Sequence, residues 1–566
     1  MDEELTSTSN VATPLWRRSA AASYAVSESQ PSAVEQSDPS FDQSVSGEAS
    51  SQDKVPSGSK KITHGSALLS SITRLQPTPL SIVASNRILN KMELQMASGP
   101  KWMFIRRFTL ALFFIAVICF VAAAMVIVIQ TPECKVIPQL GWWQKGPLYR
   151  IALQSFRDTT GNGMGDLRGI QLQLEYIAQL SAVAVIVVPY NNLNQTVNTL
   201  NPSRFLGDIF GNIQEMKALL NSAAKYGLKV ILDLTLFSAQ LESDNSTNTQ
   251  SDTVELSQNL LTEIRTWFRE GVDGIFLKMN SVNLKKEIFI ELLKTLKKMA
   301  GRYSKSSKQR VFIIATSIED PDYLISVLME VPGVMIFVYY LNDLLTSSKT
   351  VEKARTLNNY YYEQNFAWSG FTFGEGHIAS MIPEEHQGIY VKLFAVLLLT
   401  MPGTPVFYYG DEIALKDYKE SEYPLMRWDK SKYAGFTNSV PWILPGLSVY
   451  TLTVNQQSED PLSTLSFYRA LGKIRTEEQS LQYGDFNIMI NTTNILAYIR
   501  QWQETGILVI LNFGHAVTYD FTALNLSSTA LLLAKSTDLT QCKLIRLHTM
   551  AIEENMGYVL KYYKGK

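Results

Sequence analysis

The sequence predicts a single transmembrane helix, followed by a (β/α)8 barrel and a small antiparallel β domain. Residues 108–129 form a run of 22 residues without a charged side chain. From about residue 140 to 450, short β-rich apolar segments alternate with amphipathic helical stretches, and shorter alternating strands follow after about 455. A chain of 566 residues is also too long for one compact domain.

The composition excludes several classes of protein. Lys and Arg number 51 and Asp and Glu number 52, so a net charge of −1 argues against a nucleic-acid-binding protein. The 3 cysteines are too few for a disulfide framework. The 5 histidines are scattered without metal-ligand spacing, so a zinc enzyme is not expected.

Residues 1–101 are predicted to be a disordered cytoplasmic tail, with short helices near residues 80–95 as the alternative. Residues 1–60 contain 15 serines and few large apolar residues. A segment of this composition cannot bury enough apolar surface to offset its loss of chain entropy on folding.

The uncharged run predicts a membrane-spanning helix within residues 102–130. At 1.5 Å per residue it is long enough to cross a hydrocarbon core of about 30 Å. It lies more than a hundred residues from Met1, so it is not a cleavable signal peptide. Three basic residues precede it, whereas one acidic and one basic residue follow it. These flanking residues are Lys101, Arg106, Arg107, Glu133 and Lys135. The positive-inside rule therefore predicts a single-pass type II protein with a cytoplasmic N-terminus; a buried core helix is the alternative.

The N-glycosylation sequons support this topology. Each Asn-x-Ser/Thr triplet is a weak signal alone, but all four lie after the predicted span, on the side expected to be extracellular. The four asparagines are Asn194, Asn245, Asn491 and Asn525.

Residues 142–453 are predicted to form the barrel. Amphipathic stretches such as 213–226 and 256–269 have apolar residues at three- and four-residue steps. Eight strand–helix units in about 300 residues fit a (β/α)8 barrel, with a doubly wound open sheet as the alternative. The expected strands are Leu148–Leu153, Val183–Val188, Lys229–Asp233, Val272–Leu277, Val311–Ala315, Met335–Tyr339, Asn365–Trp368 and Thr404–Tyr408.

The barrel is expected to be flanked by two further segments. Residues 131–141 would form an extracellular neck. Residues 454–566 would form a C-terminal β-sandwich domain, because strands such as 495–500 and 507–511 are short and alternating.

Several strand–turn motifs resemble the α-amylase family of glycoside hydrolases. The opening match runs over nearly thirty residues, and later motifs look like that family's third, fourth and eighth strands in the right order. The resemblance covers residues from about 140 to 566. Its motifs are Trp142-Trp143, Tyr149-Arg150-Ile151, Ser155-Phe156-Arg157-Asp158, Gly161–Ile170, Ile231-Leu232-Asp233, Gly271-Val272-Asp273-Gly274 and Pro402–Ile413.

The family's chemistry does not accompany the resemblance. A retaining glycosidase needs a carboxylate nucleophile and a carboxylic acid. Where the family has Gly-x-Arg-x-Asp on its fourth strand, this sequence has Phe276 in place of the arginine and Lys278 in place of the nucleophile. No general acid is found in residues 314–317, Phe237-Ser238 replace an Asn-His pair, and a His-Asp pair is missing from residues 367–371. The resemblance therefore implies no catalytic residue and no enzyme activity.

The whole assembly resembles the 4F2-antigen type of heavy subunit of heteromeric amino-acid transporters. It combines a tail, one span, a cysteine just outside it, and an amylase-like barrel with lost carboxylates. Between Asp233 and Gly271 there is no room for an inserted subdomain, which argues against the heavy-subunit type related to b(0,+) transport.

This resemblance implies a non-catalytic accessory subunit that stabilises a multi-spanning light-chain exchanger and carries it to the plasma membrane. Large neutral or cationic amino acids would move through the partner, because one span cannot form the transport path. Integrin contacts are attributed to the family's span and tail. The alternatives are a membrane-anchored α-glucosidase-like enzyme with displaced catalytic groups and a glycoside-binding receptor.

The same resemblance implies that Cys134 forms the disulfide to the light chain. Cys134 lies five residues beyond the uncharged run, on the oxidising side of the membrane. A homodimer disulfide and a capped free thiol are the alternatives. A helix face of small side chains is expected to contact the light chain, with a chance pattern as the alternative. Its residues are Thr109, Ala116, Cys119 and Ala123.

One glycine-rich loop lies where some amylase-like proteins bind calcium. Only two of its five candidate ligands are carboxylates, although calcium prefers more. The expected structure is a turn held by hydrogen bonds, with a weakened calcium site as the alternative, and no other cofactor is expected. The candidate ligands are Asp158, Thr160, Asn162, Met164 through its carbonyl, and Asp166.

Some motif residues persist without their catalytic neighbours. Asp233, Asp411 and Glu412 are expected to act as hydrogen-bonding struts, with a relic or a binding site as alternatives. Trp142 and Trp143 either mark packing at the membrane interface or belong to the core of the first strand.

Overall fold

The protein was analysed as a computed structural model. The residues that it describes are 90–97, 99–130, 137–189, 211–235, 250–279, 286–305, 308–316, 323, 326–327, 330–331, 333–340, 367–373, 377–382, 387–416, 423–445, 452–524, 526–537 and 543–564. The chain divides into two compact units, residues 1–120 and 121–566.

The N-terminal part contains a short helix, α1 (Lys91–Ala97), and one long apolar helix, α2 (Pro100–Gln130). α2 has 31 residues, and its most apolar stretch has a mean hydropathy of 3.3. By length and composition it can cross a membrane. It extends beyond the predicted run of 108–129 at its N-terminal end and takes in the basic residues there. Every side chain of α2 is exposed.

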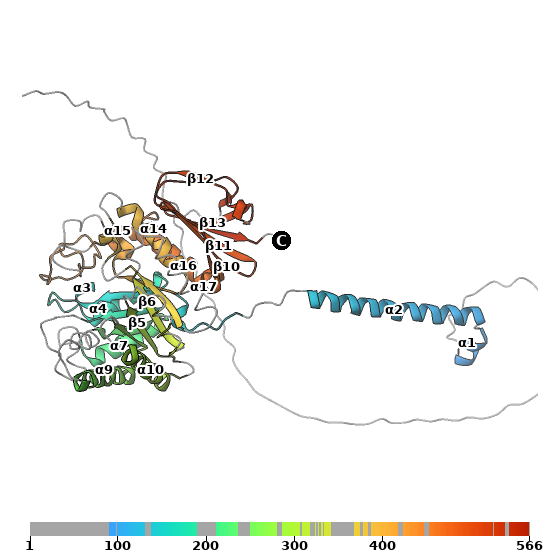
Figure 1. The fold of residues 1–566 in the computed structure, drawn as a ribbon, viewed down its shortest axis with the longest axis horizontal. Coiled ribbons are helices and arrows are strands. Elements are labelled where there is room, and N and C mark those ends of the chain that lie inside the picture. The colour runs from blue at the N-terminus through green and yellow to red at the C-terminus, as the bar shows by residue number, and fades with distance from the viewer. Residues whose placement is uncertain are drawn as a thin grey trace, which may run out of the picture. The chain divides into compact units, whose positions relative to one another are not determined.

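Eight parallel strands close into a barrel (Figure 1). Each strand pairs with the next in sequence order, and β8 pairs with β1 through the register Leu148↔Val406. The predicted barrel is confirmed, and closure excludes the open-sheet alternative. The strands are β1 (Leu148–Ala152), β2 (Ala184–Val188), β3 (Lys229–Asp233), β4 (Gly274–Lys278), β5 (Val311–Thr316), β6 (Gly333–Tyr340), β7 (Ala367–Thr372) and β8 (Thr404–Tyr408).

β7 differs most from its predicted range of residues 365–368. The strand continues through Ser369 and Gly370, two residue types that are uncommon in strand interiors and so weaken the sequence signal. Gly370 nevertheless pairs with both Val338 of β6 and Thr404 of β8. Closure of the barrel therefore decides the conformation of this segment against its local preference.

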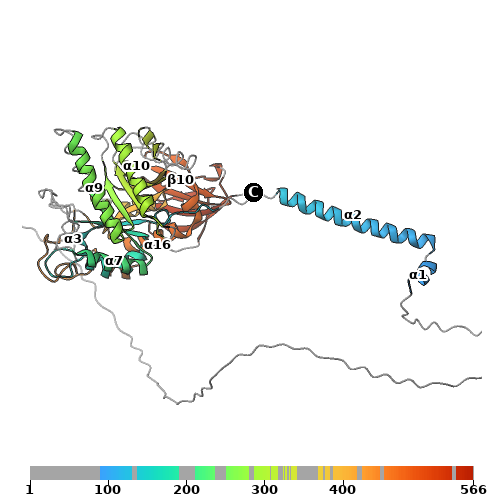
Figure 2. The ribbon, with the colours of Figure 1, turned by 90° about the horizontal axis from the view of Figure 1, so that it is seen from below.

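Amphipathic helices cover the outside of the barrel, as Figure 2 shows for α7 (Ile213–Lys225), α9 (Gln250–Glu270) and α10 (Lys286–Tyr303). α7 begins with a capping box. The Oδ1 atom of Asn212 accepts from the amide of Glu215 at 3.0 Å, and the Glu215 carboxylate accepts from the amide of Asn212 at 2.9 Å. Other helices in the described residues between β1 and β8 are α3 (Leu153–Phe156), α4 (Leu167–Leu172), α5 (Leu174–Gln179), α13 (Ile378–Met381) and α14 (Gln387–Thr400).

A tryptophan closes the N-terminal end of the barrel. Trp142 and Trp143 lie in a 3-10 helix, η1 (Trp142–Gln144), just before β1. Trp143 is 6% exposed and packs among interior side chains of the strands. The Thr404 hydroxyl donates to the Trp143 carbonyl at 2.7 Å, and the indole nitrogen of Trp142 donates to the Gln309 carbonyl at 3.0 Å. Trp143 is therefore a core residue, although it precedes the first strand.

The range predicted to be the β domain begins with helices. α15 (Val454–Glu459), α16 (Thr464–Glu477) and α17 (Gln479–Tyr483) precede the first strand, which starts at Asp485. The expectation of strands from residue 454 onward therefore differs from the structure. In α16, Leu465, Tyr468 and Leu471 are buried at the three-residue spacing of a helix face.

The terminal domain is a six-stranded antiparallel sheet with a two-stranded sheet beside it (Figure 1). The six-stranded sheet has the order β14-β13-β16-β11-β10-β9, and β12 pairs with β15. The strands are β9 (Asp485–Asn491), β10 (Ile495–Trp502), β11 (Thr505–Asn512), β12 (Val517–Tyr519), β13 (Thr529–Lys535), β14 (Lys543–Arg546), β15 (Met550–Ile552) and β16 (Gly557–Tyr563).

Both faces of the central strands are covered. Val509 of β11 belongs to the main core with the barrel helices, whereas its neighbours Leu508 and Ile510 belong to a second core. The second core also includes residues of β15 such as Met550. α14 lies between the barrel and the sheet, since it contacts β8 as well as β11 and β16. Its second half, residues 393–400, is buried at every position and carries no charged side chain, as expected for a helix segment that is covered on all sides.

Two buried arginines hold the turn between α14 and β8. The Nη1 atom of Arg475 donates to the carbonyl of Met401 at 2.6 Å, and its Nη2 atom donates to the carbonyl of Gly403. Arg500 of β10 donates to the carbonyl of Thr400 at 3.1 Å. These carbonyls are buried between the barrel and the terminal domain, so the guanidinium groups supply donors that water cannot.

We predict that Arg475→Met destabilises the folded chain by about 3 kcal/mol or more, because it leaves buried carbonyls without donors. The measurement is the denaturant midpoint of the full-length chain in detergent. Lys473→Met on the same helix is the control, since the Lys473 side chain is 67% exposed and pairs with Glu477. Equal midpoints for the two variants would contradict the prediction.

Candidate functional site

The positions expected to carry the nucleophile motif lie on β4, in the mouth of the barrel. Phe276 is buried in the interior cluster, 2% exposed. Lys278, at the end of the strand, is partly exposed, and its amide donates to the Thr235 hydroxyl at 3.1 Å. Neither side chain can form a glycosyl ester.

An internal ion pair occupies the neighbouring part of the mouth. Arg150 of β1 donates to Asp233 of β3, with Nη2 and Oδ2 2.9 Å apart. The guanidinium carbon lies 4.8 Å from the ring centroid of Phe276 and 5.8 Å from that of Tyr408. The second carboxylate oxygen of Asp233 accepts from the Thr235 amide at 2.9 Å. Both oxygens are thus engaged, as the strut interpretation of Asp233 requires.

Asp411 and Glu412 are buried struts as well. They lie in η5 (Asp411–Ile413), directly after β8. The Asp411 carboxylate accepts from the amides of Tyr408 and Ile378, each at 2.9 Å. Burial raises the pKa of Asp411 to about 7, although nearby His377 and these amides lower it. Because the Asp411 carboxyl is buried and is held by two backbone amides, it cannot reach a ligand in the mouth.

Glu412 anchors two tyrosines. The hydroxyls of Tyr149 and Tyr176 donate to its Oε1 atom at 2.7 and 2.6 Å. Burial raises the pKa of Glu412, and burial beside this carboxylate also raises the pKa of both tyrosines. The cluster joins β1 and α5 to η5 and is structural.

Hydrogen bonds hold the glycine-rich loop that was considered for calcium. The Asp158 carboxylate accepts from the Thr437 hydroxyl at 2.6 Å and from the amides of Thr160, Gly161 and Gly163. Burial raises its pKa, but these hydrogen bonds outweigh burial and leave the pKa below its usual value.

The second carboxylate of the loop is equally occupied. Asp166 caps α4 by accepting from the Gly169 amide at 2.7 Å, and it accepts from the Thr159 amide at 2.7 Å. The Asn162 side-chain oxygen accepts from the Met164 amide. Hydrogen-bond donors thus face the side-chain oxygens of this loop, as the expected hydrogen-bonded turn requires, and the calcium alternative stays a prediction. Among the described residues, no group of three or more His, Cys, Asp or Glu side chains could hold a metal ion.

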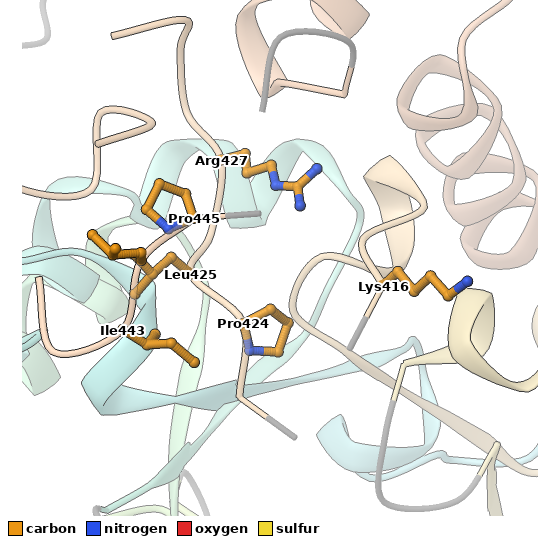
Figure 3. Close-up of a pocket in the computed structure, with 7 residues that line it drawn as sticks. Lys416, Pro424, Leu425, Arg427, Ile443 and Pro445 are labelled. Carbon is orange, nitrogen blue, oxygen red and sulfur yellow. The ribbon is translucent and has the colours of Figure 1, made fainter. Parts of the chain in front are cut away.

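A small hollow lies in the segments that follow β8 (Figure 3). Its lining combines two cationic and five apolar side chains, and burial lowers the pKa of Arg427 to about 10. The sequence offered no motif for this hollow, because its residues come from loops without a recognisable spacing. The lining residues are Lys416, Pro424, Leu425, Arg427, Ile443, Leu444 and Pro445.

Several predicted site residues lie outside the described residues, namely Cys134, Asn194, Asn245, Asn525, Phe237, Ser238 and Ser317. Asn491 is described and exposed, at the end of β9. Thr109, Ala116, Cys119 and Ala123 all lie on α2, and the Cys119 thiol is free. Their contact with a light chain stays a prediction.

Comparison with known proteins identifies the family. A family model described as the N-terminus of solute carrier family 3 member 2 matches residues 84–149, and one described as the alpha amylase catalytic domain matches residues 150–244 and 374–484. The amino acid transporter heavy chain SLC3A2 of Oryctolagus cuniculus is 30% identical over 436 residues, 75% of this chain and 77% of that protein. The chain belongs to the amino acid transporter heavy chain family.

Other heavy chains in this family agree. SLC3A2 of Mus musculus is 29% identical over 433 residues, covering 75% of this chain and 77% of that protein. SLC3A1 of Homo sapiens is 22% identical over 522 residues, covering 71% and 74%. The greater identity with SLC3A2 agrees with the sequence argument against the other heavy-subunit type.

The fold is shared with sugar-processing enzymes. The crystal structure of Bacillus licheniformis trehalose-6-phosphate hydrolase matches with a TM-score of 0.62 at 18% identity. The trehalulose synthase MutB of Pseudomonas mesoacidophila matches with 0.61 at 16%. Each match covers 75% of this chain and 100% of the other. At this identity the likeness establishes the amylase-like fold and nothing further.

We predict that Asp158→Ala lowers the stability of the chain by about 2 kcal/mol, because the buried Gly163 amide and Thr437 hydroxyl lose their acceptor. Since the folded-state pKa of Asp158 is lowered, this stabilisation is present above the carboxyl's ordinary pKa and is lost as the pH falls through the lowered value. The measurement is the denaturant midpoint of wild type and variant between pH 7 and pH 3. Neither calcium nor a chelator should move either midpoint, and a calcium-dependent rise confined to the wild type would refute the hydrogen-bonded turn.

Proposed function

We propose that this chain is a non-catalytic accessory subunit of a heteromeric amino-acid transporter. It would pair with a multi-spanning light chain, stabilise it and deliver it to the plasma membrane. The observation that carries the proposal is the 30% identity over 436 residues with a protein named an amino acid transporter heavy chain.

The proposed link to the light chain is a disulfide from Cys134. This residue falls inside the segment 84–149 that resembles the N-terminus of SLC3A2. The same segment contains α2, which is apolar enough to cross a membrane. With its basic flank inside, α2 would place Cys134 and all later residues in an oxidising extracellular compartment.

The contacts in the barrel mouth support a subunit without glycosidase activity. Phe276 stacks against Arg150, and Arg150 is paired with Asp233. The two other retained acids, Asp411 and Glu412, are buried behind the mouth. A retaining mechanism needs two carboxyl groups about 5–5.5 Å apart on either side of the scissile bond. The proposed replacements at Phe276 and Lys278 leave the fourth strand without one.

The disulfide is tested by non-reducing gel electrophoresis of the chain from native membranes. Wild type should run as a thiol-sensitive band heavier by one transporter, and Cys134→Ser should run at the monomer mass. Cys119→Ser is the matched control and should keep the heavy band, because its thiol lies within the span. Mass spectrometry of the band separates a light chain from a homodimer, and monomer mass in every lane would overturn the covalent link.

Absence of glycosidase activity is tested with an aryl α-glucoside. The purified full-length chain should release no phenol above the rate of buffer alone, because no nucleophile is available to form the glycosyl-enzyme intermediate. A rate that is proportional to protein concentration and abolished by Asp233→Asn would instead support the enzyme alternative.

A further inference from the structure

One edge of the terminal sheet is long and weakly protected. β9 is the last strand in the order β14-β13-β16-β11-β10-β9 and pairs only with β10 in the described structure. An unpaired strand edge can bind another strand, so proteins protect edges with charges, prolines or short strands. The opposite edge, β14, has 4 residues, including Lys543 and Arg546, whereas β9 has 7 residues and neither lysine nor proline.

β9 also exposes part of its apolar surface. Ile488 and Met489 in the middle of the strand are only partly buried. The register shifts there, since Ile490 pairs with Ala497 but Ile488 pairs with Tyr498, which leaves Met489 as a bulge. The bulge and Asp485 give limited protection against pairing with a second chain.

A sequon stands at the end of this edge. Asn491 is the last residue of β9, and Thr492 and Thr493 follow it in the turn to β10. All three side chains are exposed. The Thr492 hydroxyl accepts from the Ile495 amide at 2.9 Å, so Thr492 holds the turn while Thr493 is left to be recognised as the sequon's third residue.

We propose that an N-linked glycan on Asn491 shields the edge of β9 and prevents edge-to-edge pairing with a second copy of this chain. The inference rests on the proposed extracellular location. In the transfer, the Asn491 side-chain nitrogen bonds to the anomeric carbon of an oligosaccharide carried on a lipid diphosphate. The amide loses one proton, and the lipid diphosphate leaves. A bulky, hydrated glycan beside an edge strand excludes an approaching strand sterically.

The two threonines provide matched variants. Thr493→Ala removes the sequon but keeps the turn hydrogen bond, whereas Thr492→Ala removes the hydrogen bond but keeps Asn-x-Thr. Full-length chains are expressed in eukaryotic cells and solubilised in detergent with reductant, which removes any disulfide partner. Asn491→Gln and Thr493→Ala should each lose one glycosidase-sensitive mobility step, and Thr492→Ala should lose none.

Self-association is then measured by size exclusion with light scattering. Asn491→Gln and Thr493→Ala should form dimers or larger species that increase with concentration, while wild type and Thr492→Ala stay monomeric. Adding Ile488→Lys to Asn491→Gln should restore the monomer, because a lysine on an edge opposes strand pairing. Rescue by this substitution separates edge pairing from general misfolding.

The outcomes distinguish this inference from the proposed function. If glycosidase shifts no band of any variant, the extracellular location is wrong and the inference falls with it. If other sequons are modified but Asn491→Gln changes no step, or if Asn491→Gln stays monomeric, only the shielded edge is overturned.

Discussion

The structure depends on how the barrel closes beside a second domain. β8 must return to β1, and the turn that leads into it, residues 400–403, is enclosed between the barrel and the terminal sheet. The backbone carbonyls of this turn are buried, and a buried carbonyl without a hydrogen-bond donor is costly. Arg475 and Arg500 reach these carbonyls from α16 and β10. The terminal domain thus takes part in closing the barrel, because it supplies one of the two arginines.

In the described part of the barrel mouth, an ion pair and ring packing hold the retained side chains. Arg150 is paired with Asp233 and covered by the rings of Phe276 and Tyr408. Paired and hydrogen-bonded charges in a low-dielectric interior resist rearrangement, since separating them leaves an uncompensated charge. This arrangement agrees with membership in a family of transporter heavy chains and with the proposed accessory role.

The exposed strand edges lie in the terminal sheet. A closed barrel has no edge strand, so the terminal sheet carries the exposed edges of this part of the chain. β14 is short and basic, and β9 ends in a sequon. In the proposed function these features favour a monomeric ectodomain, while α2 would be available for a membrane partner.

The sequence by itself determined the long apolar helix, the eight-stranded barrel, the order of its strands and the family, because hydropathy and strand–turn motifs are local patterns. Local patterns did not predict that β7 extends through Ser369 and Gly370. These residues prefer strands only weakly, and pairing with β6 and β8 overrides that preference. Local patterns also missed the helices α15 to α17 at residues 454–483, and they left open whether Trp143 is a core residue, which the structure decided. The sequence predicted hydrogen-bonded roles for Asp158, Asp233 and Asp411, but only the tertiary structure identified their distant partners Thr437, Arg150 and Ile378. A carboxylate becomes a ligand, an acid or a strut according to the donors that folding brings to it.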